Sequence, residues 1–199
     1  LFCSRQNPDA LSDSRPALFL DRDGILLEVV RRGSTISSAR TWEEFRILAG
    51  AREMVAQARS LGFMVILATN QPDVSRGLLS AQLLEQFHRR LVQEIPLDGL
   101  EVCCEDGQHR RRKPNPGMLL DAAERWNLDL SKSYFLGDRR TDLLAARGAG
   151  VRPVLLLTEY NGEECADFPE LLTIAQLADL PGLLRSVTVG EGHNPRKET

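Results

Sequence analysis

Four short runs of apolar residues punctuate the chain, and each has the length of a β-strand. They occupy residues 17–20, 63–68, 133–136 and 154–157. Apolar and polar positions do not alternate within these runs, so both faces of each predicted strand are expected to be covered. Uniformly apolar strands of this kind are typical of a parallel sheet.

The segments between these runs carry apolar residues at helical spacing. One helix is predicted from about residue 51 to 61, and it should stop at Gly62. A second is predicted to begin after Ser80, a favourable N-cap residue. Its apolar face consists of Leu83, Leu84, Phe87, Leu91 and Ile95. Two further helices are predicted at residues 116–126 and 141–147.

This alternation of strands and helices predicts the fold class. It is α/β, with a doubly wound, mostly parallel sheet and helices on both faces. A length of 199 residues, of which 42% are hydrophobic and 27% charged, fits one globular domain. We place that domain at residues 16–185. Residues 1–15 and 186–199 are poor in apolar side chains, so flexible tails are expected there.

Charge and composition argue against several classes of partner. Lys and Arg number 25 against 28 Asp and Glu, for a formal net charge of −3, which disfavours binding to nucleic acid or to a membrane surface. No apolar run approaches the roughly 20 residues of a transmembrane helix, and the polar first residues resemble no signal peptide. Four cysteines are too few for a disulfide framework. We expect a cytoplasmic location and a monomer or weak homo-oligomer.

Candidate chemistry lies just after the predicted strands, because parallel sheets of this class bind ligands beyond the carboxyl ends of their strands. Asp21 and Asp23 follow the first run, and Gly24 permits a turn that lets both face one site. Two such carboxylates can bind a cation, or divide the roles of nucleophile and proton donor. A solvated turn accounts for the same residues equally well.

The other strand ends add further polar groups. Thr-Asn-Gln at residues 69–71 can bind phosphoryl oxygens or cap a helix. The basic residues 110–113 form either a solvated loop or an anion-binding segment. Asp138 and Asp142 are either helix-start charges or metal ligands. Jointly these groups supply the carboxylates that Mg²⁺ prefers and the cations and hydrogen-bond donors that a phosphoryl group requires.

These motifs resemble those of the haloacid dehalogenase (HAD) superfamily. The matching segments are residues 21–24, 69–71, 113 and 137–142, and the resemblance covers roughly residues 16–184. It is closest to the branch of D-glycero-D-manno-heptose 1,7-bisphosphate 7-phosphatases and histidinol-phosphatases, whose Arg-Lys-Pro-x-Pro-Gly-Met segment stands here at residues 112–118. The resemblance implies an Mg²⁺-dependent hydrolase of small phosphate esters. Heptose 1,7-bisphosphate is the leading substrate, and histidinol phosphate or another small ester is the alternative.

The resemblance also implies a role for each matched residue. Asp21 would be the nucleophile that forms an aspartyl-phosphate, and Asp23 would serve as acid and then as base. The Mg²⁺ ligands would be the carboxylate of Asp21, the backbone carbonyl of Asp23 and Asp138, with Asp142 orienting Lys113 or a metal-bound water. The phosphoryl oxygens would be held by Thr69 and Lys113. The rest of the substrate would be contacted by Asn70, Gln71, Arg112 and Arg139.

Two departures from the branch lie close to these motifs. Ile25 stands where the branch usually has Thr, a change of little expected consequence. Residues 72–75 read Pro-Asp-Val-Ser where the branch has Ser-Gly-Ile-Ala. The added Asp73 would repel an anionic substrate unless it points away or binds a hydroxyl or amine of that substrate.

A third departure concerns zinc, which branch members usually hold in a loop before Arg-Lys-Pro. Cys103 keeps the first ligand position, His109 replaces the third ligand, and Arg111 stands at the fourth. A cation cannot ligate zinc. Cys103, Cys104 and His109 could form only a partial site, so zinc is not expected as a cofactor. The two cysteines are expected at the end of a strand as small buried residues.

Two non-enzymatic interpretations compete with the phosphatase. A response-regulator-like phospho-acceptor also combines Asp, Thr and Lys on a parallel sheet, but its acceptor Asp follows the third strand, whereas Asp21 follows the first. A degenerate relative that only binds ligand would account for the altered loops. The intervals between the motifs leave no room for a lid domain, so we expect a capless core whose site is covered by short loops such as residues 29–38 and 104–111.

Overall fold

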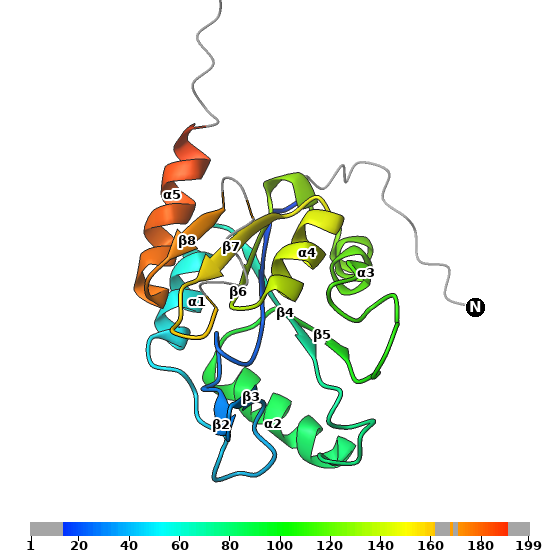
Figure 1. Cartoon of the computed structure of the whole chain (residues 1–199). Helices are drawn as coiled ribbons and strands as arrows, with labels where there is room; N and C mark the ends of the chain where they lie inside the picture. The colour runs from blue at the N-terminus through cyan, green and yellow to red at the C-terminus, as the bar shows by residue number, and fades with distance from the viewer. Residues whose placement is uncertain (1–13, 162–167, 169–170, 191–199) are drawn as a thin grey trace, which may run out of the picture.

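The sheet of this protein has six strands, all parallel, in the order β5-β4-β1-β6-β7-β8 (Figure 1). The structure is a computed structural model that describes residues 14–161, 168 and 171–190. The strands are β1 (Ala17–Leu20), β4 (Met64–Asn70), β5 (Gly99–Cys103), β6 (Tyr134–Gly137), β7 (Arg152–Leu156) and β8 (Leu172–Ile174). An antiparallel hairpin of β2 (Val30–Arg32) and β3 (Thr35–Ser37) lies outside this sheet.

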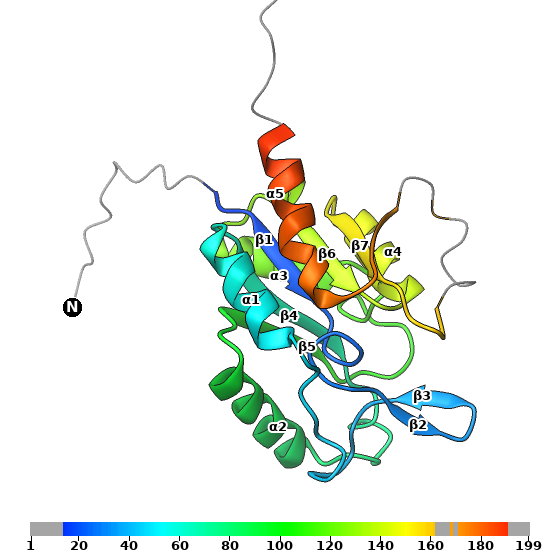
Figure 2. The same cartoon turned by 90° about the vertical axis from the view of Figure 1, so that its left-hand side faces the viewer.

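Helices cover both faces of the sheet. They are α1 (Ala51–Ser60), α2 (Ala81–Glu94), α3 (Gly117–Trp126), α4 (Arg140–Gly148) and α5 (Leu180–Gly190), with short 3₁₀ turns at Leu130–Lys132 and Leu177–Asp179. Alternate strand residues point to opposite faces. Leu18 and Leu20 therefore pack in one core with α1 and α5, and Ala17 and Phe19 pack in a second core with α3 and α4. Figure 2 shows α1 and α5 on the near side of the strands.

The predicted fold class is confirmed, and the four predicted strands and four predicted helices are present with ends shifted by one or two residues. Ser80 caps α2 as expected, since its hydroxyl accepts a hydrogen bond from the Leu83 N–H at 3.1 Å. Gly62 has a φ of 91°, a conformation that L side chains rarely adopt, and it follows the end of α1.

Sequence patterning did not predict the hairpin β2–β3, strand β8 or helix α5. Helix α5 continues through residues 186–190, beyond the end predicted for the domain at residue 185. At the other end, Arg15 already pairs with the core, and its N–H donates to the Asn127 carbonyl at 3.3 Å. The remainder of the two predicted tails, residues 1–13 and 191–199, lies outside the described residues. In the part of the chain that the structure describes, no helix combines the length and apolar character needed to cross a membrane.

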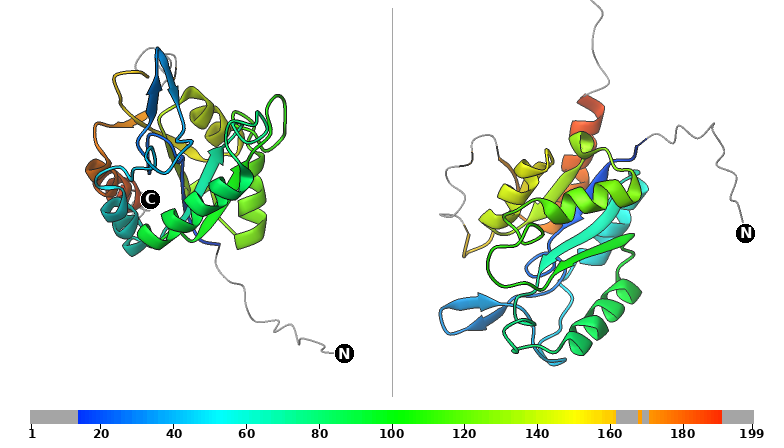
Figure 3. Two further views of the ribbon diagram at one scale, coloured as in Figure 1. Left: turned by 90° about the horizontal axis from the view of Figure 1, so that it is seen from below. Right: turned by 90° about the vertical axis from the view of Figure 1, so that its right-hand side faces the viewer.

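The carboxyl ends of the parallel strands meet at one edge of the sheet. The hairpin β2–β3 and helix α2 lie toward this edge, as the view from below in Figure 3 shows. There is no separate lid domain in the described chain, and the hairpin is the element of regular structure that overhangs the strand ends.

Replacing Leu18 with Ala should lower the free energy of unfolding by about 2–5 kcal/mol, because Leu18 is fully buried in the central strand and a cavity would remain. Urea denaturation followed by circular dichroism measures the change. Leu120→Ala is the matched control, since Leu120 is 44% exposed on α3 and its loss should cost under about 1 kcal/mol. Equal losses in the two variants would contradict the assigned core.

Candidate active site

Three buried carboxylates meet at the carboxyl edge of the sheet. Asp21 directly follows β1, Asp138 directly follows β6, and Asp142 lies in the first turn of α4. One oxygen from each lies within 4.8 Å of the others. Since β1 and β6 are adjacent strands, the topology of the sheet brings these residues together across more than a hundred positions of sequence.

Lys113 places one cationic group against this cluster. Its Nζ lies 2.7 Å from an oxygen of Asp21 and 2.7 Å from an oxygen of Asp142, and it donates to the Ala68 carbonyl at 2.8 Å. Asn70 holds the backbone of Lys113 from both sides, since its amide donates to the Lys113 carbonyl at 2.9 Å and its carbonyl accepts from the Lys113 N–H at 3.0 Å. Asn70 therefore positions the lysine as well as lining the cavity.

Asp23 has a different set of partners from Asp21. One oxygen of its carboxylate accepts hydrogen bonds from the Gln71 amide at 2.8 Å and the Ser38 hydroxyl at 2.9 Å. The fully buried Arg22 lies 3.1 Å from the same carboxylate. Gln71 also donates to the Thr69 hydroxyl oxygen at 3.0 Å. The two carboxylates of this loop are thus held in distinct environments.

The predicted substrate contact from Gln71 is not supported by its position. Gln71 is fully buried, its amide is bound to Asp23 and Thr69, and its carbonyl accepts from Arg22. Arg112 is also turned away from the cavity, because its guanidinium donates to the Glu105 carbonyl at 2.7 Å and lies 3.5 Å from Asp106. The sequence motif identified these two residues, but their side-chain directions depend on neighbours that are remote in sequence.

Electrostatics at the cluster favour neutralisation of its negative charge. Burial, followed by repulsion from Asp21 and Asp142, raises the pKa of Asp138 above its usual value. Burial also raises the pKa of Asp21, against the attraction of Lys113. For Lys113, burial alone would lower the pKa, but the attraction of Asp142 and Asp21 raises it above the ordinary value. Three acids share one ammonium group, and a further cation would relieve the repulsion among them.

The donor set at the cluster fits a divalent cation. The Oδ1 atom of Asp138 is buried and has no hydrogen-bond partner in the described chain. Its Oδ2 atom is already engaged, because it accepts from the Tyr160 hydroxyl at 2.6 Å. Gly24 leaves space for this pair, since a Cβ there would lie 2.4 Å from Asp138 Oδ2. An open buried carboxylate oxygen beside two further carboxylates is the kind of site that Mg²⁺ takes together with substrate oxygens.

A cavity of about 310 Å³ opens onto this cluster. Its lining includes the five carboxylates Asp21, Asp23, Asp73, Asp138 and Asp142, the segment 35–38, and the arginines Arg40, Arg76 and Arg139. Arg40 and Arg76 were not predicted as site residues. Arg40 belongs to no motif, whereas Arg76 and Gly77 match the Arg-Gly pair that follows Thr-Asn-Gln in the branch that the motifs resemble.

Asp73 does not stand unpaired in the cavity. Its carboxylate accepts from Arg40 Nε at 2.8 Å and lies 3.7 Å from Arg76. Asp73 is only 6% exposed. The sequence predicts that the negative charge of Asp73 repels an anionic substrate. Two neighbouring guanidinium groups, those of Arg40 and Arg76, offset this charge.

The end of β5 and the loop after it contain the residues at the positions where the branch has zinc ligands. Cys103 is buried at the end of β5, as expected, and Cys104 is partly buried. Cys103 Sγ and His109 Nδ1 lie 3.8 Å apart, and across the described residues the one group of three or more possible metal ligands is Asp21, Asp138 and Asp142.

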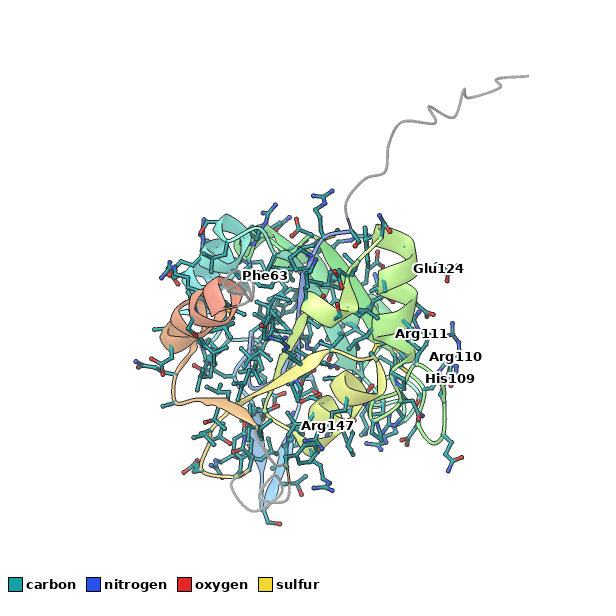
Figure 4. The ribbon with its side chains drawn as sticks, turned by 90° about the horizontal axis from the view of Figure 1, so that it is seen from above. Phe63, His109, Arg110, Arg111, Glu124 and Arg147 are labelled. Atoms are coloured by element: carbon teal, nitrogen blue, oxygen red, sulfur yellow. The ribbon has the colours of Figure 1, made fainter. Side chains whose placement is uncertain are left out.

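Arg111, at the position of the fourth zinc ligand, binds two carboxylates. Its guanidinium lies 2.6 Å from the buried Glu101 and 2.6 Å from Asp121. Asp121 also lies 2.8 Å from Arg110. Figure 4 shows His109, Arg110 and Arg111 together on the outer side of the molecule, beside α3. The charged contacts tie the loop to β5 and α3.

Comparison with known proteins agrees with this arrangement. A HAD-hydrolase-like family model matches residues 110–180. The D-glycero-beta-D-manno-heptose-1,7-bisphosphate 7-phosphatase of Rhodopseudomonas palustris is 32% identical over 161 residues, which are 71% of this chain and 83% of that protein. The enzyme of the same name from Pasteurella multocida is 30% identical over 194 residues, covering 87% and 98% of the two chains.

Solved structures of phosphatases are also similar to this chain. The crystal structure of D,D-heptose 1,7-bisphosphate phosphatase from B. bronchiseptica, complexed with magnesium and phosphate, superposes with a TM-score of 0.74 at 30% identity. The match covers 86% of this chain and 99% of that one. A putative HAD-like phosphatase from Mesorhizobium loti superposes with a TM-score of 0.70 at 25% identity, over 92% and 90% of the two chains.

A parallel sheet that gathers acids and one buried lysine at the ends of its central strands defines a HAD-like phosphatase. Within that class, the chain belongs to the D-glycero-D-manno-heptose-1,7-bisphosphate 7-phosphatase family. The superfamily and branch that the sequence motifs resemble are both confirmed.

His88 makes the stability of the protein sensitive to acid. Burial on α2, and then the nearby Arg22, lower the pKa of His88 to about 4, while the unfolded chain binds the same proton near pH 6.5. The unfolded state therefore takes up the proton first, and stability should fall as pH drops from about 6.5 to 4, by up to about 3 kcal/mol. His88→Gln should lack this component, and His109→Gln, at an exposed histidine, should retain it. Urea titrations across this pH range measure the difference, and parallel curves for wild type and His88→Gln would contradict the assignment.

Proposed function

We propose that this chain is an Mg²⁺-dependent phosphatase that removes the 7-phosphate of D-glycero-D-manno-heptose 1,7-bisphosphate. The observation that carries the proposal is the placement of Asp21 at the end of the central strand β1, 2.7 Å from Lys113 and in one cluster with Asp138 and Asp142. A carboxylate nucleophile requires a cationic environment, because the attacking group and the phosphate are both negative.

The proposed reaction assigns separate steps to the two acids of the first loop. Asp21 attacks phosphorus, the bond between phosphorus and the sugar oxygen breaks, and Asp23 donates its proton to that oxygen. The product is an aspartyl-phosphate on Asp21 and a free hydroxyl on the sugar. Asp23 then takes a proton from a water molecule that attacks phosphorus, which releases phosphate and restores Asp21.

Other residues hold the phosphoryl group during these steps. Lys113 is the fixed cation, and Asp142, 2.7 Å from its Nζ, orients it. The Thr69 hydroxyl accepts from Gln71, which leaves its own hydrogen available for a phosphoryl oxygen. Bound Mg²⁺ would neutralise charge between nucleophile and phosphate, and the residues proposed to hold it are Asp21, Asp138 and the backbone carbonyl of Asp23.

The choice of a sugar bisphosphate is supported by the relatives and by the charge of the cavity. The relatives in R. palustris and P. multocida carry the name of the beta anomer, and one from Burkholderia mallei, 33% identical over 167 residues, carries that of the alpha anomer. Arg40, Arg76 and Arg139 line the cavity, and a second phosphate would share the guanidinium groups of Arg40 and Arg76 with their present partners Asp73 and Asp106.

Further proposals concern the location, oligomeric state and partners of the protein. We propose that the protein acts in the cytoplasm as a monomer or weak homo-oligomer, without nucleic-acid or membrane partners. The near-balanced charge of the chain supports the absence of polyanionic partners. Light scattering on the purified chain measures the oligomeric state.

Asp21→Asn should lower phosphate release by at least about a thousandfold, because the amide cannot serve as nucleophile. The assay is release of inorganic phosphate with Mg²⁺, and with EDTA in a parallel series, from both anomers of heptose 1,7-bisphosphate, histidinol phosphate and p-nitrophenyl phosphate. Asp179→Asn, at an exposed capping residue, is the control. Full activity of Asp21→Asn would overturn the mechanism. If the wild-type chain binds Mg²⁺ but releases phosphate from none of these esters, the protein is a binding protein and not a phosphatase.

Arg40→Gln should reduce the ratio of kcat/KM for heptose 1,7-bisphosphate to kcat/KM for p-nitrophenyl phosphate by about tenfold or more, because a charge-assisted contact to the second phosphate is lost. Steady-state kinetics with both esters give this ratio. Arg52→Gln, an exposed arginine on α1, is the control. A ratio unchanged in Arg40→Gln would exclude Arg40 from recognition of the second phosphate.

A further inference from the structure

The two oxygens of Asp138 have different surroundings. Asp138 contributes one oxygen to the buried carboxylate cluster, and its Oδ1 is buried with no hydrogen-bond partner within the described chain. Oδ2 accepts a hydrogen bond of 2.6 Å from the hydroxyl of Tyr160, which lies in the segment after β7. The phenol therefore distinguishes two oxygens that are chemically equivalent in a free carboxylate.

The position of Tyr160 is fixed by its neighbour Asn161. Asn161 is fully buried, and its amide donates to the Asp138 carbonyl at 2.9 Å and to the Leu156 carbonyl at 2.8 Å. Its carbonyl accepts from the Thr158 N–H at 2.9 Å. The first of these bonds joins the turn after β7 to the residue that follows β6, and the other two hold the turn against the end of β7. The backbone beside Tyr160 is thereby fixed next to Asp138.

Two further contacts surround the phenol. The guanidinium of Arg139 lies 4.9 Å from the centre of the Tyr160 ring, within the range of a cation–π interaction. On the other side, a Cβ at Gly24 would approach within 3.0 Å of the Tyr160 hydroxyl and 2.4 Å of Asp138 Oδ2. The absence of a side chain at residue 24 is therefore what permits the phenol and the carboxylate to meet.

We propose that Tyr160 is a positioning residue that makes Asp138 a one-oxygen metal ligand and thereby selects Mg²⁺ over Ca²⁺. The inference rests on the Mg²⁺ site of the proposed function. With Oδ2 held by the phenol, Oδ1 is the oxygen of Asp138 that has no hydrogen-bond partner in the described chain and can bind a metal ion. Mg²⁺ takes six ligands in a strict octahedron, whereas Ca²⁺ takes six to eight and readily accepts both oxygens of one carboxylate. A carboxylate limited to one oxygen suits the smaller ion.

Removal of the phenol hydroxyl tests this role. Tyr160→Phe keeps the ring and frees Oδ2, and groups that orient a metal ligand typically contribute 10–100-fold in affinity. Isothermal titration of the full chain with MgCl₂, and separately with CaCl₂, should show the Mg²⁺ dissociation constant rising about tenfold. The ratio of the Ca²⁺ to the Mg²⁺ dissociation constant should fall by at least about threefold. Tyr160→Leu, which also removes the ring, should change this ratio in the same direction.

The chain contains two tyrosines, so Tyr134→Phe is a matched control. The Tyr134 hydroxyl contacts Arg152 at 3.0 Å and none of the acids of the cluster, and its loss should leave both dissociation constants unchanged. The midpoint of thermal unfolding in EDTA gives the structural cost of each substitution without metal.

A lower midpoint in EDTA for Tyr160→Phe, with both dissociation constants and their ratio as in wild type, would show a merely structural role and overturn the proposal. If Tyr160→Phe binds both ions more weakly but keeps the wild-type ratio of the Ca²⁺ to the Mg²⁺ dissociation constant, the proposal that Tyr160 selects Mg²⁺ over Ca²⁺ is overturned. A wild-type chain that binds no Mg²⁺ would overturn the metal site of the proposed function, and this inference with it.

Discussion

Three carboxylates share one buried space with a single ammonium group, and the other features of the site follow from this excess of negative charge. Asp21, Asp138 and Asp142 are brought together because β1 and β6 are neighbours in the sheet. Burial strengthens their mutual repulsion, since little water separates them. Lys113 offsets part of it, and it remains in place because Asn70 binds its backbone on both sides. The remaining charge gives the site its affinity for a divalent cation.

The same loop contains a second acid with a different environment. Asp21 faces the lysine and the other carboxylates, whereas Asp23 is held by Gln71, Ser38 and the buried Arg22. Two chemically identical groups separated by one residue can perform different steps only when their surroundings differ in this way. The side chains around Asp23, of which Arg22 and Gln71 are fully buried, therefore set its environment apart from that of Asp21.

The sequence predicts the parts of this protein that depend on local pattern. Uninterrupted apolar runs locate β1, β4, β6 and β7, and the acids after β1 and β6 follow from their place at strand ends. The hairpin β2–β3 is polar and short, and β8 has three residues, so neither has enough pattern to be predicted. The contacts of Tyr160 and Arg40 are also invisible, because their partners Asp138 and Asp73 are 22 and 33 residues away. The inward turn of Gln71 depends on Arg22, again a tertiary neighbour.

The site is built in two layers that are held in place by different interactions. Asp21 and Asp138 stand at the ends of strands whose side chains form the cores, so displacing them would disturb the packing of the sheet. The far wall of the cavity consists of loop arginines paired with loop acids, such as Arg40 and Arg76 with Asp73. The arginines of these pairs are partly exposed, but Asp73 is only 6% exposed, so removing an arginine would leave a buried carboxylate with fewer partners. The ion pairs of Arg111 with Glu101 and Asp121 hold the next loop in the same manner. The sheet therefore places the acids of the cluster, and these ion-paired loops build the opposite wall of the cavity.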